Sequence, residues 1–520
     1  MAVHLHPQDN VAIAKIALQA GVVLEIERPA GTTGRPGPRA RVRVRQPIPS
    51  GHKIALREIA ADEPVRRYGQ LIGFASRAIS PGEHVHTHNL GVQDFARALD
   101  SGAGVRPVVP VPERERRTFM GYRRADGRVG TRNVVAVISS VNCSAHAALE
   151  IAHAFAPERL APYRNVDGVV AFVHQSGCSS RIGSPDYVFL QRTLAGVARH
   201  PNVGACVLVG LGCEVNQIGT LVETYDLCHC GNAPPGCPPA LLIQELGGIR
   251  KTVEAGIATV EGLLPTVNAT VRSAQPVSEL VVALQCGGSD GWSGVTANPA
   301  IGLVADEVVR QGGTVLLAET PEIYGAEHLL ARRAVSQELV EALMAHVRWW
   351  EAHTQRLGIR MDNNPSPGNK AGGLTTIYEK SVGAVAKGGS TPLTGVYDYA
   401  EPVTARGLTF MNSPGNDWIS VTGQVGGGCN LVLFSTGRGS VFGSRLAPCI
   451  KVSSNSDTYR RMVDDMDVNA SAVLEGTALG DVAAELLDRV VAVASGQPSK
   501  SEAQGVGESE FCPWGLGGTL

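Results

Sequence analysis

VVAVISSVNCS (134–144) is the first of four apolar runs that decide the fold of this chain. Each run is rich in Val, Leu and Ala, has about the length of a buried strand, and then breaks into Gly, Ser, Asn or Cys. In a parallel α/β sheet such breaks lie at the carboxyl ends of the strands, where ligands bind. The other runs are GVVAFVHQSGCSS (168–180), GACVLVGLGCE (204–214) and ELVVALQCGGSDGWSG (279–294). We therefore expect four cysteines to line one edge of one sheet: Cys143, Cys178, Cys213 and Cys286.

The composition is that of a folded protein with more than one domain. A chain of 520 residues is too long for one ordinary core, and 43% hydrophobic with 18% charged residues is typical of soluble proteins. The 61 glycines suit tight turns and close approach of the backbone to a ligand. A net charge of −2 and the lack of long basic runs argue against nucleic acid as a partner.

Neither a targeting segment nor a membrane span is recognisable. The N-terminus, MAVHLHPQDN, has no apolar signal segment, and no stretch approaches the ~18 apolar residues of a membrane helix. The eleven cysteines are spread through a large chain, which favours reduced thiols over a disulfide framework. We expect a cytoplasmic protein that does not bind membranes.

The chain divides into three units and a linker. Residues 1–97 are β-rich, with strand composition at 42–49, 52–59 and 70–79. Beyond residue 119, strand-like runs alternate with helical stretches, which indicates parallel sheets with covering helices. We therefore expect an α/β fold, a small β-rich domain followed by two α/β domains with mainly parallel sheets. The predicted boundaries are 1–97, a Pro-, Val- and Arg-rich linker 98–118, a second domain 119–272, and a C-terminal domain 277–520.

The cysteines at the strand ends allow two interpretations, metal binding and simple packing. Thiolates bind iron or zinc, and a rim of loops can bring several together, but free cysteine is also a small apolar residue that packs well near strand ends. CHCGNAPPGC holds Cys228, Cys230 and Cys237, which suits a small zinc site. Because no fourth ligand is nearby in the sequence, a loop with incidental thiols is favoured there.

Three histidines of the first unit, in GEHVHTHN (82–89), share one face of an extended segment because side chains alternate along a strand. They are His84, His86 and His88, and His52 lies in the nearby GHK (51–53). Such imidazoles can bind a divalent metal or pass a proton. The alternative is a solvated edge strand whose histidines only form hydrogen bonds.

Several loops carry groups suited to an acidic ligand. The Gly/Ser/Asp loop in 284–299 leads into a helix, whose first amides attract anions, and its aspartate could also bind a metal. A lysine in 363–373 and an arginine in 434–440 suit a carboxylate, although solvated loop residues are the simpler reading. The residues concerned are Ser289, Asp290, Asn369, Lys370, Asn416 and Arg438.

Five stretches in this order resemble the altronate dehydratase and galactarate dehydratase family: GYRRADGRVGTRN (121–133), GLGCE (210–214), QCGGSDGWSGVTANP (285–299), NPSPGNKAGG (364–373) and STGRGS (435–440). The first unit resembles the SAF domain of that family, including GHKIAL (51–56) and YGQLIG (68–73). The resemblance spans roughly residues 8 to 500. It implies a lyase that dehydrates a sugar acid to a 2-keto-3-deoxy acid with a divalent metal, often iron.

Three stretches favour an altronate-like aldonate as the substrate: HVHTHN (84–89), PEIYGAEHLL (321–330) and SPGND (413–417). Galactarate is an alternative. STGRGSVFG (435–443) and RRMVDDMDVN (460–469) are similar instead to the sulfolactate sulfo-lyase branch, which eliminates sulfite. A protein that binds a sugar acid without turning it over is the non-enzymatic alternative.

Dehydration of a 2,3-dihydroxy acid requires a base for the C2 proton, help for the departing C3 hydroxyl, and a cation that stabilises the enediolate. Candidate catalytic residues are His174, Lys370, His52 and His86, and candidate substrate-binding residues are Ser289, Asp290, Asn369, Arg438 and Asn416. Candidate metal ligands are Cys143, Cys178, Cys213, Cys286, His84 and His88. The expected cofactor is Fe²⁺, with Mn²⁺, Mg²⁺ or an iron–sulfur cluster as alternatives. The expected partners are a small sugar acid and a second copy of the chain in a homodimer.

Overall fold

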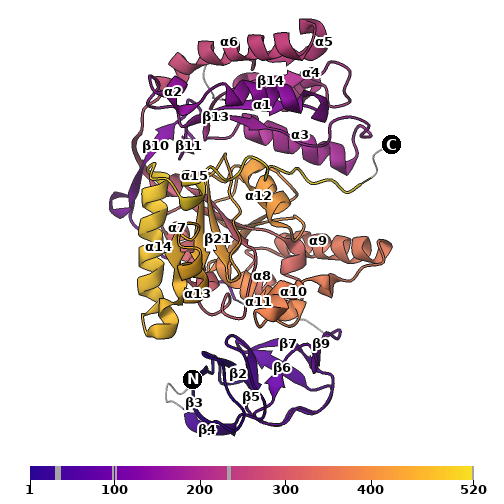
Figure 1. Cartoon of the computed structure of the whole chain (residues 1–520), viewed down its shortest axis with the longest axis vertical. Coiled ribbons are helices and arrows are strands. Elements are labelled where there is room, and N and C mark those ends of the chain that lie inside the picture. The colour runs from indigo at the N-terminus through magenta and orange to yellow at the C-terminus, as the bar shows by residue number, and fades with distance from the viewer. Residues whose placement is uncertain (30–36, 96–98, 100–101, 103, 231–235, 518–520) are drawn as a thin grey trace.

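The computed structural model describes residues 1–29, 37–95, 99, 102, 104–230 and 236–517. Figure 1 shows three units stacked along the long axis, with the C-terminal unit between the other two. The expected α/β fold with a small β-rich N-terminal unit is confirmed. Within the described residues, every helix is too short or too polar to cross a bilayer.

The N-terminal unit is built from short antiparallel strands around a small core that includes Val11, Ile72 and Val85. The strand orders are β1-β2-β5-β8, β6-β7-β9 and β3-β4. The strands are β1 (Ala2–Val3), β2 (Val11–Ala14), β3 (Val23–Arg28), β4 (Gly37–Arg43), β5 (Lys53–Ala55), β6 (Pro64–Arg67), β7 (Gln70–Ala75), β8 (His84–Val85) and β9 (Leu90–Gly91). Of the predicted linker 98–118, residues 98, 100, 101 and 103 lie outside the described residues.

The second unit is a parallel sheet in the order β13-β12-β14-β15, with helices on both faces. Neighbouring residues of a strand point to opposite faces, so Val135 packs with α1 and α6 while Ala136 packs with α3. The strands are β12 (Val134–Ser139), β13 (Gly168–Phe172), β14 (Val203–Gly210) and β15 (Ala240–Leu242). The helices are α1 (Ala145–His153), α2 (Pro157–Leu160), α3 (Pro185–Ala198), α4 (Ile218–Thr224), α5 (Ile243–Leu246) and α6 (Ile249–Asn268).

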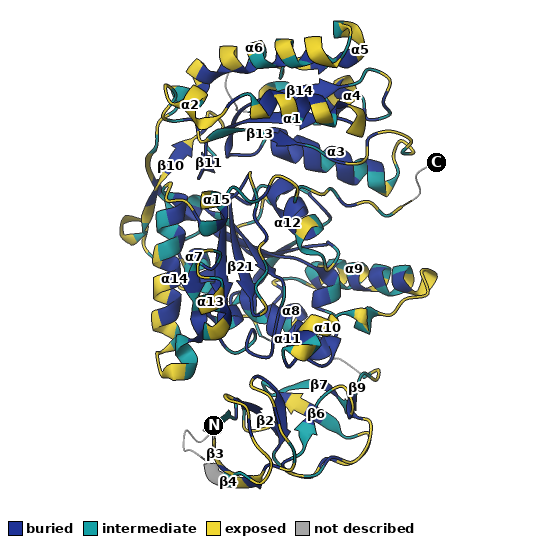
Figure 2. Ribbon diagram, in the orientation of Figure 1, coloured by how far each residue is buried: buried dark blue, intermediate teal, exposed yellow. Residues whose placement is uncertain are grey.

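The C-terminal unit contains a seven-stranded parallel sheet in the order β19-β20-β18-β17-β21-β22-β23. Figure 2 shows β21 buried between helices whose outer faces are exposed. The strands are β17 (Val281–Cys286), β18 (Thr314–Leu317), β19 (Leu393–Tyr397), β20 (Gly407–Met411), β21 (Leu431–Thr436), β22 (Cys449–Ser453) and β23 (Val468–Asn469). The helices are α7 (Ala297–Arg310), α8 (His328–Ala331), α9 (Gln337–Arg356), α10 (Pro367–Ala371), α11 (Ile377–Val385), α12 (Asp417–Gly426), α13 (Ser456–Arg461), α14 (Leu479–Ala494) and α15 (Lys500–Ala503).

The second and C-terminal units pack against each other through α3 and α12, where a Cβ at Gly196 would lie 2.0 Å from the carbonyl oxygen of Gly426. The hydroxyl of Thr131 donates to the carbonyl of Asn430 at 2.7 Å, and Nε2 of His200 lies 2.9 Å from the carbonyl of Cys429. A small antiparallel sheet of β11 (Val129–Gly130), β10 (Thr118–Arg123) and β16 (Ser273–Pro276) is formed by the segments that flank the second unit along the chain.

This arrangement corrects the prediction that four cysteines line one sheet. Cys143, Cys178 and Cys213 follow β12, β13 and β14, but Cys286 ends β17 in the other sheet. The sequence runs share one pattern because both sheets are buried and parallel, and that pattern does not say which strands pair.

The expectation of reduced cysteines holds for nine free thiols and fails for one pair, because Cys228 and Cys237 form a disulfide. The bond closes the small loop in which the sequence favoured incidental thiols. A single disulfide among eleven cysteines is not a framework that holds the fold.

The contact between the two sheets predicts acid sensitivity through His200. Burial lowers the pKa of His200 to about 3, against 6.5 for an exposed histidine. Between these values the unfolded chain binds a proton that the folded chain does not, so stability is lost as the pH falls through this window. The free energy of unfolding of the wild type should fall between about pH 7.5 and about pH 5. In His200→Gln this fall should be smaller by about 2 kcal/mol, as measured by denaturant titration at the two pH values. The exposed His146→Gln is the control, and an equal loss in wild type and His200→Gln would contradict the assignment.

Candidate functional site

The C-terminal sheet has a topological switch point at β17. The chain continues from β17 to β18 on one side, whereas β21 pairs with β17 on the other, so the loops after β17 and β21 diverge. Cys286 pairs with Ser435 at the ends of these strands, and the amide of Arg438 donates to the carbonyl of Gly288 at 2.7 Å. Ligands of open α/β sheets bind in such crevices.

A cluster of buried charged and thiol groups lies at this edge. Cys286 ends β17, Glu319 follows β18, and Glu322 lies in the turn Thr320–Glu322. Two lysines face them: Lys387 Nζ lies 2.8 Å from the sulfur of Cys286, and Lys380 forms a short ion pair with Glu322. We call these five residues the charged cluster.

The surroundings of the cluster shift the pKa values of its two carboxyl groups in opposite directions. Burial, reinforced by repulsion from Glu322, raises the pKa of Glu319 well above its usual value. Burial also opposes ionisation of Glu322, but the attraction of Lys380 and Lys387 outweighs it and lowers that pKa. Asn364 supports the ionised form of Glu322, because its amide donates to Glu322 Oε1 at 3.0 Å. The pKa values of the two carboxyl groups are therefore shifted in opposite directions, as in many acid–base pairs of enzymes.

The same residues fit a divalent metal ion. Among the described residues, only Cys286, Glu319 and Glu322 offer three ligand atoms that lie within 4.8 Å of one another. Oε1 of Glu319 is buried without a hydrogen-bond partner, so it has a free lone pair for an ion. A thiolate with two carboxylates suits a divalent transition metal.

Asp417 lies beside the cluster at the first turn of α12. Its Oδ1 accepts a hydrogen bond from the amide of Gln285 at 3.0 Å, and its Oδ2 lies so close to Gly287 that a Cβ there would be 2.1 Å away. Burial, with the charge of Glu322, raises the pKa of Asp417 to about 6. Asn416 caps the helix, since its side chain accepts from the amide of Ile419 at 3.3 Å.

Two of the predicted substrate-binding residues connect the loops at this edge. Asn369 donates to the carbonyl of Ser289 at 2.8 Å and so ties loop 364–373 to the end of β17. Asp290 is buried, and its carboxylate accepts hydrogen bonds from Ser293, Ser454 and Asn455. These contacts hold the loops after β17 and β22 together.

Two cations at the rim are available to a ligand. Arg438 is exposed and Lys370 is half-buried, and neither side chain has a hydrogen-bond or ion-pair partner among the described residues. The stem of Arg438 lies against loop 364–373, because a Cβ at Gly372 would be 3.1 Å from Arg438 Cδ. Both groups therefore stand at the same loop.

The histidines of the N-terminal unit cover this loop. The ring of His84 lies 5.2 Å from that of His86 and 5.4 Å from that of His88, so the three gather as the alternation predicts. Nε2 of His52 and Nε2 of His86 lie 3.2 and 2.9 Å from the carbonyls of Ala371 and Lys370. Burial lowers the pKa of His52 to about 4 and that of His84 to about 3, so these rings are neutral near pH 7.

A fully buried ion network fastens the N-terminal unit. Lys53 Nζ lies 2.9 Å from both carboxylate oxygens of Glu379, and Arg67 Nη1 lies 2.6 Å from Oε1. Lys53 also donates to the carbonyl of Gly373 at 2.8 Å. Both cations come from the N-terminal unit, whereas Glu379 comes from α11, so the network exists only when the two units are joined.

The remaining predicted residues lie elsewhere. Cys143, Cys178, Cys213 and His174 belong to the carboxyl edge of the second sheet. Both nitrogens of the buried His174 contact the main chain, since Nε2 lies 3.0 Å from the carbonyl of Ser139 and the amide of Ser176 donates to Nδ1 at 3.1 Å.

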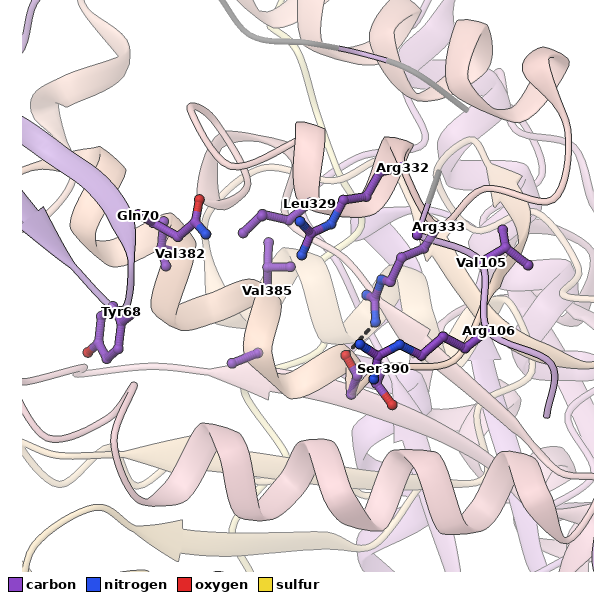
Figure 3. A pocket seen from close by; sticks show the side chains of 13 residues that line it. Tyr68, Gln70, Val105, Arg106, Leu329, Arg332, Arg333, Val382, Val385 and Ser390 are labelled. Carbon is purple, nitrogen blue, oxygen red and sulfur yellow. Dashed lines mark hydrogen bonds between the residues drawn. The ribbon is translucent and has the colours of Figure 1, made fainter. Parts of the chain in front are cut away.

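A separate cavity of about 690 Å³ opens between the N-terminal unit and α11. Figure 3 shows Arg106, Arg332, Arg333 and Ser390 around it, with Tyr68 at its far side. None of its lining residues belongs to the charged cluster. We therefore place the candidate active site at the switch point and not in this cavity.

Family models match three successive parts of the chain. Residues 277–519 match the C-terminal domain of D-galactarate/altronate dehydratase, and residues 121–268 match the second domain of D-galactarate dehydratase/altronate hydrolase. Residues 1–93 match the SAF domain of altronate/galactarate dehydratases. The chain belongs to the altronate and galactarate dehydratase family. It is therefore an enzyme of the lyase class, as the sequence resemblance implied.

Full-length relatives support this membership of the dehydratase family. The chain is 34% identical to altronate dehydratase of Bacillus subtilis (strain 168) over 498 residues, covering 95% of each chain. It is 34% identical to galactarate dehydratase (L-threo-forming) of Escherichia coli (strain K12) over 497 residues, covering 95% of this chain and 93% of that one. The beta subunit of (2R)-sulfolactate sulfo-lyase from Chromohalobacter salexigens is 33% identical over 399 residues, covering 76% of this dehydratase-family chain and 96% of the subunit.

Sequence reasoning missed most of the charged cluster, namely Glu319, Glu322, Lys380 and Lys387. Two signals were present. Glu319 comes directly after the apolar run TVLLA (314–318), at the edge where ligands bind, and both lysines, together with Glu379, interrupt the mainly apolar stretch 377–387. Charged residues rarely stand in a buried helix without a partner.

The buried network predicts a strong effect of Glu379→Gln. Removing the charge leaves Lys53 and Arg67 buried without an anion, so we expect the protein to lose about 3–5 kcal/mol of unfolding free energy in denaturant titration. Glu254→Gln, which breaks the exposed pair of Arg250 and Glu254 on α6, should change nothing measurable. Limited proteolysis should release the N-terminal unit faster in Glu379→Gln. Equal stability of the two variants would show that the network does not hold the units together.

Proposed function

We propose that this dehydratase-family protein converts a sugar acid, an altronate-like aldonate, to a 2-keto-3-deoxy acid at the switch point of its C-terminal sheet. The observation that supports this is the charged cluster, because it brings two carboxyl groups whose pKa values are shifted in opposite directions, a thiol and two ammonium groups into one buried place. A protein that only binds a sugar acid does not need two carboxyl groups with opposite pKa shifts next to its ligand.

The rim binds the carboxylate of the substrate. Arg438 and Lys370 supply two positive charges at loop 364–373, and a guanidinium suits a carboxylate through paired hydrogen bonds. The substrate then extends from the rim toward the charged cluster, with C2 and C3 above it.

Asp417 takes the C2 proton. Its Oδ1 is held by Gln285, while its Oδ2 has no hydrogen-bond partner among the described residues. A base is most effective when its pKa lies near the working pH, and a pKa of about 6 leaves Asp417 largely ionised at neutrality. The ammonium groups of Lys380 and Lys387 stabilise the negative charge that develops on the substrate.

Cys286, Glu319 and Glu322 would hold a divalent metal, which we propose to be Fe²⁺, and the ion would supply Lewis-acid help to the departing C3 hydroxyl. Burial raises the pKa of Cys286 to about 11, while Lys387 acts against that rise, so metal binding would displace the proton of the thiol. The enol left after loss of water becomes the 2-keto acid by tautomerisation.

The test of the function is turnover of the purified chain under anaerobic conditions with ferrous iron. The panel contains altronate, galactarate, related aldonates and sulfolactate, with 2-keto-3-deoxy acid, pyruvate and sulfite as readouts. We expect a 2-keto-3-deoxy acid from altronate. Preference for galactarate would change the substrate, sulfite from sulfolactate would change the leaving group, and binding without turnover of any substrate would overturn the proposal.

Removal of the base tests its place in this site. We expect Asp417→Asn to lower kcat roughly a hundred- to ten-thousand-fold with little change in KM, because the amide keeps the contact with Gln285 but accepts no proton. Asp488→Asn, which changes an exposed carboxylate on α14 that pairs with Arg117, should leave kcat unaltered. Full activity of Asp417→Asn, with melting temperature unchanged, would assign the base elsewhere.

A further inference from the structure

Three cysteines stand together at the carboxyl edge of the second sheet, which the proposed reaction does not use. Cys143 lies in the turn Asn142–Ser144 after β12, Cys178 follows β13, and Cys213 follows β14. β12 lies between β13 and β14, so this edge has its own topological switch point. All three thiols are free and exposed, although unpaired cysteine is usually a buried residue.

Direct hydrogen bonds join the three loops to one another. The amide of Asn142 donates to the carbonyl of Ser176 at 2.9 Å, which links the first loop to the second. Asn216 links the third loop to both, because its amide donates to the carbonyl of Gly177 at 3.0 Å and its side chain donates to the carbonyl of Ser140 at 2.8 Å. Each bond ends within three residues of one of the cysteines, so the three loops that carry the thiols are held together at this edge.

Buried polar groups beneath the loops fix this geometry. Glu214 is buried, and its carboxylate accepts from the hydroxyl of Ser140 at 2.7 Å and from the amide of Gly212 at 2.6 Å. His174 braces the second loop through Ser139 and Ser176, and burial lowers its pKa to about 4, which keeps it neutral. These contacts set the loops in place before any ligand binds, as a metal site requires.

The backbone beside two of the cysteines adopts conformations that have a cost. Gly177 has a φ of +99°, and a Cβ there would lie 2.4 Å from the carbonyl of Ser140. Ser179, next to Cys178 on the other side, has a φ of +60°, which is unfavourable for a residue with a side chain. Such strain persists where the surroundings impose it, and it concentrates at ligand sites.

We propose that Cys143, Cys178 and Cys213 bind an iron–sulfur cluster. Three thiolates are soft ligands that select iron–sulfur clusters, zinc or Cu(I). A single zinc ion would draw three sulfur atoms to within about 4 Å of one another, given Zn–S distances of about 2.3 Å. These three sulfur atoms do not all lie within 4.8 Å of one another, which argues against a preformed site for a single zinc ion, whereas in a cluster each thiolate binds a different iron.

The surroundings suit a cluster of four irons with one iron open. The amide of Gln244 lies 3.3 Å from the sulfur of Cys213, and hydrogen bonds to sulfur stabilise such clusters. Because the thiols face solvent, the fourth iron would take water or an oxygen ligand such as a hydroxyl or carboxylate. Cys286 is not part of this site, since it ends β17 in the other sheet and its thiol contacts Lys387 and Glu322.

The experiment uses the full chain, purified anaerobically and supplied with ferrous iron and sulfide. We expect about four irons and four acid-labile sulfides per chain, with the visible absorption and the electron paramagnetic resonance signal of a reduced cluster. Each of Cys143→Ser, Cys178→Ser and Cys213→Ser should lose sulfide and absorption. Cys512→Ser, which replaces another exposed free cysteine, should keep both.

Cys286→Ser separates this inference from the proposed reaction. It should abolish sugar-acid turnover while leaving the sulfide content and the spectrum unchanged. Should a serine variant fail to fold, alkylation of wild-type protein decides instead: the loaded cluster should protect Cys143, Cys178 and Cys213 from iodoacetamide but leave Cys512 reactive. Absence of acid-labile sulfide, zinc as the bound metal, a disulfide among the three, or equal alkylation of all four cysteines would each overturn the proposal.

Discussion

The joining of the N-terminal unit to the C-terminal sheet depends on one buried carboxylate. Glu379 compensates Lys53 and Arg67, and neither cation could stay in the interior without it. The network holds loop 364–373 through Gly373, and that loop in turn positions Asn369, Lys370 and Asn364. The loops at this edge and the charged cluster are thus held in place by an ion network that is made of other residues.

The strands and their loops could be predicted from the sequence because they rest on local patterns. Buried parallel strands are continuous apolar runs, and the glycines and cysteines that end them stand at the ligand-binding edge. The gathering of His84, His86 and His88 also follows from the alternation of side chains along an extended segment. Motifs of the dehydratase family then identified the fold and the class of reaction.

The site itself depends on pairings between distant segments, which no local pattern contains. Cys286 resembles the other strand-end cysteines in sequence, but it lies in another sheet and its neighbours are Lys387 and Glu322. The sequence suggests that Asp290 binds substrate or a metal, but its carboxylate accepts five hydrogen bonds from residues of the surrounding loops. In the sequence Lys380 is an ordinary helix residue, and its partners Glu322 and Asn364 come from segments that only the folded chain brings to it.

Loop 364–373 is attached at both ends, and this couples two distant parts of the molecule. Asn364 holds Glu322 and Lys380, while Lys370, Ala371 and Gly373 contact the N-terminal unit. A displacement of that unit would therefore pull on the segment that aligns Glu322 with Lys380. The seating of a small β-rich domain and the geometry of a carboxylate in another domain are thus linked through one short stretch of backbone.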